Sequence, residues 1–378
     1  MVKTLALFFS FRISLSDWYD SGILEREAKL YNELSKYFYE IYFLTYGGKD
    51  DKKYSSYLAP NIRVVPMPLI QRGGRKQFRP LMLVYSILMP FIHWKILKNA
   101  SILKTNQIPG CWTAVMAKMI FKKRLLLRCG YVWSYFALQD RENVIKVYIK
   151  KIIEKFSCSF SDAVVCSSMW DQNYLQRNYK VKAKVIPNYV DTEIFKPLNI
   201  PRKKDSICFV GRLERQKNLI ALLEALKALP YELTIIGNGS MRKELQRKAE
   251  ADNINVRFIN SVSHLKLPEI LNQHETFILP SLYEGTPKAL LEAMSCGLPV
   301  IGTDIKGIND IIEHKKNGYL CDTSASSIKE GILELLGNKT VQERISINAR
   351  RTILKNFSIE VGLDKEKGIY QNIEVGEI

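Results

Sequence analysis

The chain has 378 residues, of which 47% are hydrophobic and 25% charged. That length exceeds what one hydrophobic core usually serves, so we expect two globular domains rather than a low-complexity or disordered chain. The seven cysteines are scattered and form no C-x-x-C pair, which argues against a disulfide framework or a zinc site and favours a reducing compartment.

The formal net charge of +18 is unevenly distributed. Residues 1–195 hold 30 Lys and Arg against 15 Asp and Glu, whereas residues 196–378 hold 26 against 23. A basic first half fits a plain solvated surface, and it also fits binding to an anionic membrane, a phosphorylated acceptor or nucleic acid. Nucleic acid is the least favoured of these, because no recognised nucleic-acid motif accompanies the charge.

Short apolar runs alternate with amphipathic segments through the first half. The first run, residues 4–9, precedes no small-residue cleavage site, so we expect a buried strand rather than a signal peptide. Further strands are expected at 40–45, 62–66, 102–105, 125–128, 163–166 and 184–187, with helices such as 22–36, 110–121 and 144–156 between them. This βαβ alternation predicts a parallel sheet covered by helices.

Two of these apolar segments raise the question of membrane contact. Residues 81–97 are short for a membrane span and contain Pro90, His93 and Lys95, so a core helix is the favoured interpretation. Four cations in residues 72–80 precede this segment, and four lysines accompany the apolar face of 144–156. A basic flank beside an apolar face is also what a surface-inserting helix needs, so both interpretations stay open.

The alternation restarts after a linker near 188–202 that is marked by Pro187, Pro197 and Pro201. Strands are expected at 206–210, 232–236, 256–259, 276–279 and 299–302, and helices at 219–228 and 241–252. The fold class is therefore α/β, with a first domain at 1–190 and a second at 191–356.

The segment 280–304, PSLYEGTPKALLEAMSCGLPVIGTD, is the most informative part of the chain. It is typical of a strand, a loop, a helix and a second strand, with Thr286 expected to cap the helix and Gly297 to end it. A helix that starts at the carboxyl end of a strand is a common ligand site, and its amides favour phosphate. Glu284 on the loop and Glu292 on the helix are carboxylates that can each accept two hydrogen bonds from a vicinal diol such as a ribose.

With the surrounding glycines, leucines and prolines, this pair of glutamates resembles the signature of the retaining GT-B glycosyltransferases of the "glycosyl transferases group 1" family, family 4 type. The alternative is a strand–helix unit with two solvated glutamates. The resemblance implies two Rossmann-like domains facing each other across a cleft, with the nucleotide sugar, a UDP- or GDP-sugar, held mainly by the second. It implies that Glu284 lies near the donor sugar and that Glu292 binds the ribose. The residues expected around sugar and phosphate are Gly285, Thr286, Pro287, Lys288, Ala289 and Leu290.

Other segments resemble the same family. FVGRLERQKNL (209–219) contains Gly211, Arg212 and Lys217, and the resemblance implies that the two cations hold the diphosphate. Fixed cations stabilise a departing anion without a metal. IIGNGS (235–240) resembles a glycine turn beside the nucleotide base and contains Gly237 and Gly239.

Two further motifs depart from the family pattern. IPNYVD (186–191) resembles the entry to the second domain but has Tyr189 where a glycine is usual. GIND with NGYL (307–310 and 317–320) resembles a late family pattern with Asp310 in place of a glutamate.

The acceptor half is less constrained. Ser21-Gly22 is expected to follow the first strand and to precede a helix, and Gly22 either lets the backbone approach the ligand or is a plain helix-start turn. Arg128-Cys129-Gly130 stands where many relatives carry a histidine, so we expect Arg128 or the following backbone to face the sugar. No partner base is visible for Cys129 as a nucleophile. The polar residues 105–107 either line the acceptor cleft or form a loop.

The resemblance extends to the C-terminus, where residues 357–378 are expected to form a helix that packs back onto the first domain. It implies a metal-independent hexosyltransferase without a cofactor. The basic first half suggests an acceptor at a membrane surface, a saccharide or lipid-linked intermediate of the cell envelope. We expect a cytoplasmic protein that is either free or attached peripherally to the inner face of the cytoplasmic membrane through its basic first domain. The alternatives are an epimerase-like enzyme, a phosphorylase or a non-catalytic nucleotide-sugar-binding protein. The sequence does not predict the oligomeric state.

Overall fold

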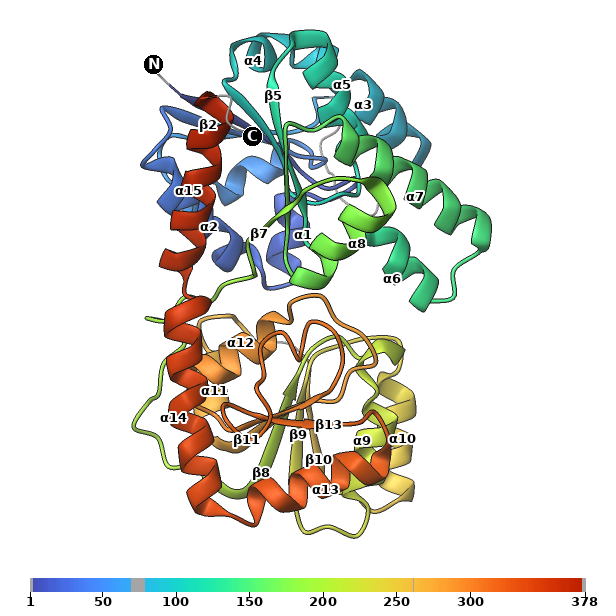
Figure 1. Ribbon diagram of the computed structural model, residues 1–378, viewed down its shortest axis with the longest axis vertical. Coiled ribbons are helices and arrows are strands. Elements are labelled where there is room, and N and C mark those ends of the chain that lie inside the picture. The colour runs from blue at the N-terminus through green and yellow to red at the C-terminus, as the bar shows by residue number, and fades with distance from the viewer. Residues whose placement is uncertain (1–2, 69–78, 261, 376–378) are drawn as a thin grey trace. The chain divides into compact units, whose positions relative to one another are not determined.

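The computed structural model describes residues 3–68, 79–260 and 262–375 (Figure 1). Most of the basic stretch 72–80 lies outside these residues. The chain divides into two compact units, Met1–Ile186 with Leu363–Ile378 (unit 1) and Pro187–Gly362 (unit 2). The boundaries expected from the sequence fell at 190/191 and 356/357.

In the described part of unit 1, seven parallel strands form one sheet in the order β3-β2-β1-β4-β5-β6-β7. The strands are β1 (Thr4–Phe8), β2 (Glu40–Leu44), β3 (Ile62–Val65), β4 (Ile102–Thr105), β5 (Arg124–Cys129), β6 (Ala163–Cys166) and β7 (Lys184–Val185). The central strands are continuous apolar runs because helices cover both faces of the sheet. The expected strand positions are confirmed to within a few residues at each end.

Helices of unit 1 lie on both faces of this sheet (Figure 1). They are α1 (Leu15–Asp20), α2 (Leu24–Ser35), the 3₁₀ helix η1 (Lys49–Tyr57), α3 (Arg79–Ile92), α4 (Trp94–Asn99), α5 (Cys111–Phe121), α6 (Trp133–Gln139), α7 (Val144–Ser159), α8 (Met169–Tyr179) and the C-terminal α15 (Ile359–Val375). The strand order reverses between β1 and β4, so right-handed crossovers put α2 on one face and α3, α5 and α7 on the other. No helix in the described ranges is both long and apolar enough to cross a membrane.

One short helix changes the expected path after the first strand. Helix α1 stands between β1 and Ser21-Gly22, and its start is fixed by a capping box between Ser14 and Asp17. Ser21-Gly22 therefore follows the first strand and precedes helix α2, as expected, with α1 in between. Gly22, with φ +70°, makes the left-handed turn between α1 and α2.

In the described part of unit 2, six parallel strands form a second sheet in the order β10-β9-β8-β11-β12-β13. The strands are β8 (Lys203–Val210), β9 (Glu232–Ile236), β10 (Val256–Ile259), β11 (His274–Leu279), β12 (Val300–Thr303) and β13 (Tyr319–Cys321). The helices are η2 (Arg215–Lys217), α9 (Leu219–Leu226), α10 (Arg242–Ala251), α11 (Leu267–Asn272), α12 (Lys288–Ser295), α13 (Ala325–Leu336) and α14 (Lys339–Asn356). A single apolar core runs between this sheet and its helices.

The strand order of unit 2 also reverses, between its adjacent central strands β8 and β11. In open parallel sheets ligands bind at the carboxyl ends of the strands at such a reversal, because the two following loops leave in opposite directions. The loops after β8 and β11 are the two segments that carry the strongest motifs in the sequence, residues 211–218 and 280–287.

Candidate active site

The loops after β8 and β11 meet through an ion pair. Lys217 Nζ contacts Glu284 Oε1, and the two side chains are only 13% and 8% exposed. Ser281 Oγ donates to the same carboxylate oxygen at 2.7 Å. Gln216 joins the loops a second time, because its Nε2 donates to the Tyr283 carbonyl at 2.7 Å. Two residues predicted from separate motifs are thus in direct contact.

Glycines let the loops after β8 and β9 lie against each other. A Cβ on Gly237, which has φ +143°, would stand 1.9 Å from the Gly211 carbonyl oxygen, and one on Gly239 would stand 2.3 Å from that of Leu213. The Gly211 amide donates to the Ile236 carbonyl at 3.0 Å. Close backbone packing therefore explains these glycines, and it holds the loop that carries the exposed Arg212 beside the glycine turn.

Helix α12 starts one residue later than expected. Pro287, with ψ 111°, is the N-cap and makes no side-chain hydrogen bond to the first turn, so the prediction that Thr286 caps the helix is wrong. The physical reason is that Thr286 lies in the loop, where its carbonyl accepts from Asn188 Nδ2 at 2.7 Å. Lys288 begins the helix, and the positive end of the helix dipole at this terminus favours an anionic ligand.

The helix ends as expected. Cys296 is its C-cap, and Gly297 follows with φ +67° in the left-handed conformation that favours glycine.

Glu292 lies on the second turn of α12 and is only 4% exposed. Its Oε1 lies 3.2 Å from His264 Nε2, which comes from the segment before α11. The other ring nitrogen of His264 is buried without a hydrogen-bond partner among the described residues. His264 is a site residue that the sequence did not indicate, because no motif surrounds it and 28 residues separate it from Glu292.

Two other predicted residues of this segment, Ala289 and Leu290, direct their side chains to the core. Leu290 is completely buried in the core, and Ala289 packs against that core. The backbone of Gly307 packs closely against the Gly285 carbonyl, since a Cβ on Gly307 would stand 1.7 Å from that carbonyl oxygen. The late motif at 307–310 therefore supports the loop that carries Glu284.

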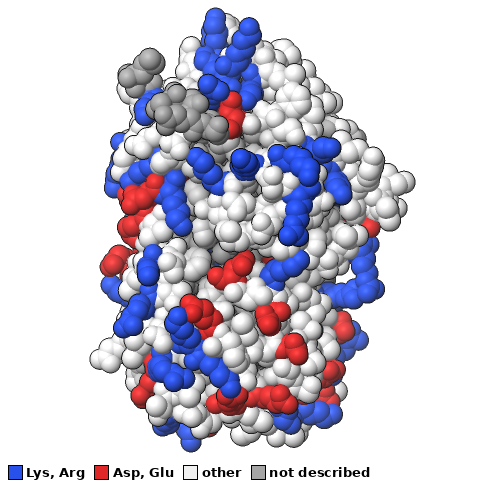
Figure 2. Space-filling model, in the orientation of Figure 1, with Lys and Arg blue, Asp and Glu red and all other residues white. Residues whose placement is uncertain are grey.

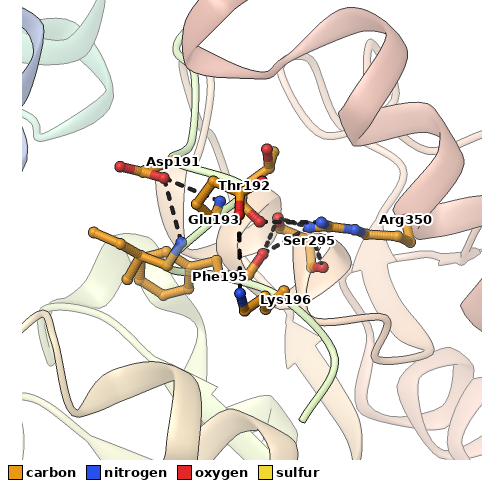
Figure 3. Close-up of polar contacts among 8 residues, drawn as sticks. Asp191, Thr192, Glu193, Phe195, Lys196, Ser295 and Arg350 are labelled. Carbon is orange, nitrogen blue, oxygen red and sulfur yellow. Dashed lines mark hydrogen bonds and ion pairs between the residues drawn. The ribbon is translucent and has the colours of Figure 1, made fainter.

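An arginine on α14 fixes the end of α12 (Figure 3). Arg350 Nη1 donates to the carbonyls of Phe195 and Ser295 at 2.7 and 2.8 Å, and Nη2 donates to the Thr192 carbonyl at 3.0 Å. Ser295 lies one turn beyond Glu292, so this guanidinium ties the helix that carries Glu292 to the segment that enters unit 2. Three fixed hydrogen bonds from a planar cation restrict the rotation and sliding of α12.

The remaining predicted site residues, Gly22 and Arg128, belong to unit 1. Gly22 is exposed in the turn after α1. Arg128 is partly buried on β5, and its amide donates to Thr105 Oγ1 at 3.0 Å. The Gly130 amide donates to Gln107 Oε1 at 2.8 Å, so two of the polar residues 105–107 hold the end of β5.

The structure also describes the environment of Cys129 and the distribution of side chains that can ligate a metal. Cys129 is fully buried, and burial raises the pKa of its thiol well above the usual range, which does not suit a nucleophile. Within the described residues, no group of three His, Cys, Asp or Glu side chains could hold a metal ion.

The comparisons with known proteins cover both units. A family model described as "Glycosyl transferases group 1" matches residues 190–352, and one described as "Glycosyltransferase Family 4" matches residues 28–194. The chain is 30% identical over 264 residues to the UDP-Gal:alpha-D-GlcNAc-diphosphoundecaprenol alpha-1,3-galactosyltransferase of Escherichia coli, and the match covers 64% of this chain and 68% of the relative.

Solved structures show the same fold at low sequence identity. Sucrose-phosphate synthase from Thermosynechococcus elongatus matches with a TM-score of 0.84 and 17% identity, over 99% of this chain and 100% of that one. HepE from Anabaena, in complex with UDP and glucose, matches with a TM-score of 0.77 and 15% identity, over 97% and 99% of the two chains. The chain therefore belongs to the glycosyl transferases group 1 family and is a family 4-type glycosyltransferase with the GT-B fold.

Proposed function

We propose that the enzyme transfers a sugar from a UDP- or GDP-sugar, with retention of anomeric configuration, to a lipid-linked saccharide or polysaccharide intermediate of the cell envelope. The observation that carries the proposal is the contact of Lys217 with Glu284 at the strand-order reversal of unit 2, beside the start of the helix that bears Glu292.

The donor is proposed to lie along these loops in a fixed order. Glu292 would accept hydrogen bonds from the ribose hydroxyls, because a buried carboxylate discriminates strongly for a diol. The diphosphate would lie between the start of α12 and the cations Arg212 and Lys217. The transferred sugar would lie near Glu284, whose carboxylate is held in position by the ion pair with Lys217.

The chemistry follows from this order. The bond between the sugar C1 and the diphosphate oxygen breaks, and a bond forms between C1 and an acceptor hydroxyl oxygen on the same face. The proton of that hydroxyl passes to the departing diphosphate. The negative charge that develops on the diphosphate is stabilised by Arg212, Lys217 and the α12 dipole, so we predict no requirement for a metal or another cofactor. No protein nucleophile is assigned to the reaction.

Two relatives support the choice of substrates. The printed name of the Escherichia coli relative gives UDP-Gal as its donor and a diphosphoundecaprenol-linked GlcNAc as its acceptor. The Anabaena structure contains UDP and glucose. By analogy, a uridine nucleotide and a lipid-linked acceptor are the first pair to test here, in an enzyme that we propose works on the cytoplasmic side.

The test is a transfer assay with a panel of UDP- and GDP-sugars and undecaprenyl-diphosphate-linked GlcNAc, with and without EDTA. We expect a glycosylated lipid from one donor, undiminished by EDTA, and the donor's anomeric configuration in the product by NMR. Conversion of the donor to an isomeric sugar nucleotide without acceptor would instead indicate an epimerase. Donor binding without any turnover on saccharide acceptors would favour the non-catalytic alternative.

A further inference from the structure

Helix α7 buries its polar face and exposes its apolar face, the reverse of an ordinary surface helix. The side chains that it buries in unit 1 are Glu154, Ser157 and Cys158, which are polar or small. The side chains that it exposes are large and apolar: Val144, Ile145, Tyr148, Ile149, Ile152 and Phe156, at 78, 68, 64, 50, 51 and 45% exposure. A helix of a soluble surface normally buries its apolar stripe, so this exposed stripe needs a partner.

The buried face explains why the helix keeps this orientation. Glu154 accepts hydrogen bonds from the Ser134 amide at 3.1 Å and from the Tyr179 hydroxyl at 2.9 Å. Ser157 accepts from Cys111 Sγ at 2.8 Å. Rotating α7 to bury its apolar stripe would break these bonds and leave Glu154 without its donors, so the stripe stays outward.

Lysines border the exposed stripe. At 100° per residue, the apolar positions centre on the side opposite to the buried ones, with Lys151 and Lys155 along one border and Lys146 along the other. All three lysines are exposed. The nearest acids in sequence are Glu154, which is buried on the opposite face, and Glu142, which is paired with Lys150 at 2.6 Å.

Two neighbouring helices also expose apolar side chains. Helix α5 contacts both α3 and α7, and the three follow one another on the same face of the sheet (Figure 1). Met119 and Ile120 at the end of α5 are 57% and 43% exposed, beside the exposed Lys122.

Helix α3 buries Met82, Tyr85 and Met89, so the core-helix interpretation of residues 81–97 holds for one face. Its other face exposes Leu81, Leu83, Val84, Ile87, Leu88, Phe91 and Ile92.

We propose that this surface of α7, α5 and α3 docks onto an anionic lipid bilayer, with the apolar side chains at the level of the upper acyl chains and the lysines among the headgroups. An apolar stripe that lies in the membrane plane between basic borders is the arrangement that binds such an interface. Helix α7 has 16 residues, so its part of the surface is about 24 Å long along the helix axis.

The positive charge of unit 1 favours an anionic bilayer, rather than a second copy of the chain, as the partner of this surface. Residues 1–195 carry an excess of 15 positive charges, and Lys and Arg predominate over unit 1 on the face shown in Figure 2. Two such surfaces would repel each other, whereas an anionic membrane attracts them. The inference extends the proposed function by naming the surface that brings the enzyme to its acceptor, and it relies on that function only for the acceptor's identity.

The test is co-flotation of the full chain with vesicles of phosphatidylglycerol and phosphatidylcholine, compared with vesicles of phosphatidylcholine alone. We expect binding to the anionic vesicles that weakens as salt is raised. The variant Ile145→Ser/Ile149→Ser should bind at least tenfold more weakly, because it removes two exposed apolar side chains without changing the charge. Lys146→Gln/Lys151→Gln/Lys155→Gln should weaken binding about fivefold per lysine.

Ile347→Ser is the matched control, because Ile347 is 60% exposed on α14 of unit 2 and should not affect flotation. No binding to anionic vesicles at low salt, or equal binding by the isoleucine variant and the wild type, would overturn the proposal. So would a dimer in analytical ultracentrifugation that Ile145→Ser/Ile149→Ser dissociates. Donor titration of the same variants separates the two proposals, since docking variants should bind nucleotide sugar as the wild type does.

Discussion

At the scale of single residues, Lys217 and Glu284 are nearly enclosed, so each depends on the other's charge. Removing one partner of a buried ion pair typically costs about 3–5 kcal/mol, because the remaining charge is left without compensation. We predict that Lys217→Met lowers the free energy of unfolding by an amount in this range, and that Lys217→Met/Glu284→Gln recovers most of it. Urea denaturation measures both. Equal stability of the single and double variants would show that the pair is not coupled as described.

The residues of this site differ in how far the sequence predicts them. Glu284, Glu292 and Lys217 stand in segments whose local pattern is distinctive, and the fold brings the first and last together. His264 could not be predicted, since its contact with Glu292 depends on how the segment before α11 lies against α12. Arg128 was singled out only by position in a loose resemblance, and its role stays a prediction.

At the scale of elements, the loop that carries Glu284 is shaped by Gly307. That residue has φ +83°, and a Cβ there would stand 1.7 Å from the Gly285 carbonyl oxygen. We predict that Gly307→Ala displaces the loop and lowers donor affinity at least tenfold, with a loss of stability of about 1–2 kcal/mol from the left-handed backbone alone. Calorimetric titration and urea denaturation of the variant test this.

Gly368→Ala is the control for that variant. Gly368 lies within α15, and a Cβ there would meet nothing within 4 Å. Because alanine is a better helix former, we expect unchanged affinity and a gain of about 0.5–1 kcal/mol. Unchanged donor affinity in Gly307→Ala would contradict the proposed support of the loop.

Most strands could be predicted because buried parallel strands are short, continuous apolar runs. The elements that were not foreseen include two brief ones, α1 with six residues and β13 with three, and also the longer helices α13 and α14. The start of α12 was displaced by one residue because Asn188, distant in the chain, takes the Thr286 carbonyl. Such competing tertiary contacts leave no local signal.

At the scale of the whole molecule, α15 is held to unit 1 by a buried ion pair. Lys104 Nζ contacts Glu366 Oε1, both side chains are at most 3% exposed, and the Tyr370 hydroxyl donates to the same carboxylate at 3.0 Å. Burial opposes ionisation of Glu366, but Lys104 and Arg128 together hold its pKa below the usual value. The stability from this group is therefore present above the unfolded-state pKa and is lost as the pH falls through the folded-state pKa.

We predict that Glu366→Ala lowers the free energy of unfolding of unit 1 by about 3–5 kcal/mol near neutral pH, because it leaves the Lys104 charge buried and alone. Lys104→Met/Glu366→Leu should recover most of the loss, since it replaces both charges with apolar groups. Urea denaturation of the three proteins provides the measurement. A double variant no more stable than Glu366→Ala would indicate that α15 is held by other contacts.

The two-unit organisation could be predicted from the restart of the βαβ pattern and the proline-marked linker. The return of the C-terminal helix to unit 1 could not be derived from local pattern, because the buried partner of Glu366 lies 262 residues away. Only the resemblance to known glycosyltransferases predicted it. The outward apolar stripe of α7 was visible as periodicity, but which face would be buried was decided by Glu154 and its donors.

The most direct test of the account is calorimetric titration of the wild type, Glu292→Gln and Glu224→Gln with a panel of UDP- and GDP-sugars. We predict that at least one nucleotide sugar binds the wild type. Glu292→Gln should bind it about 10- to 100-fold more weakly, because hydrogen bonds to a charged group are worth about 1.5–3 kcal/mol. Glu224→Gln, on the half-exposed side chain of a surface pair on α9, should bind as the wild type does. Binding of no nucleotide sugar, or equal affinity in Glu292→Gln and the wild type, would contradict the assignment of the donor site.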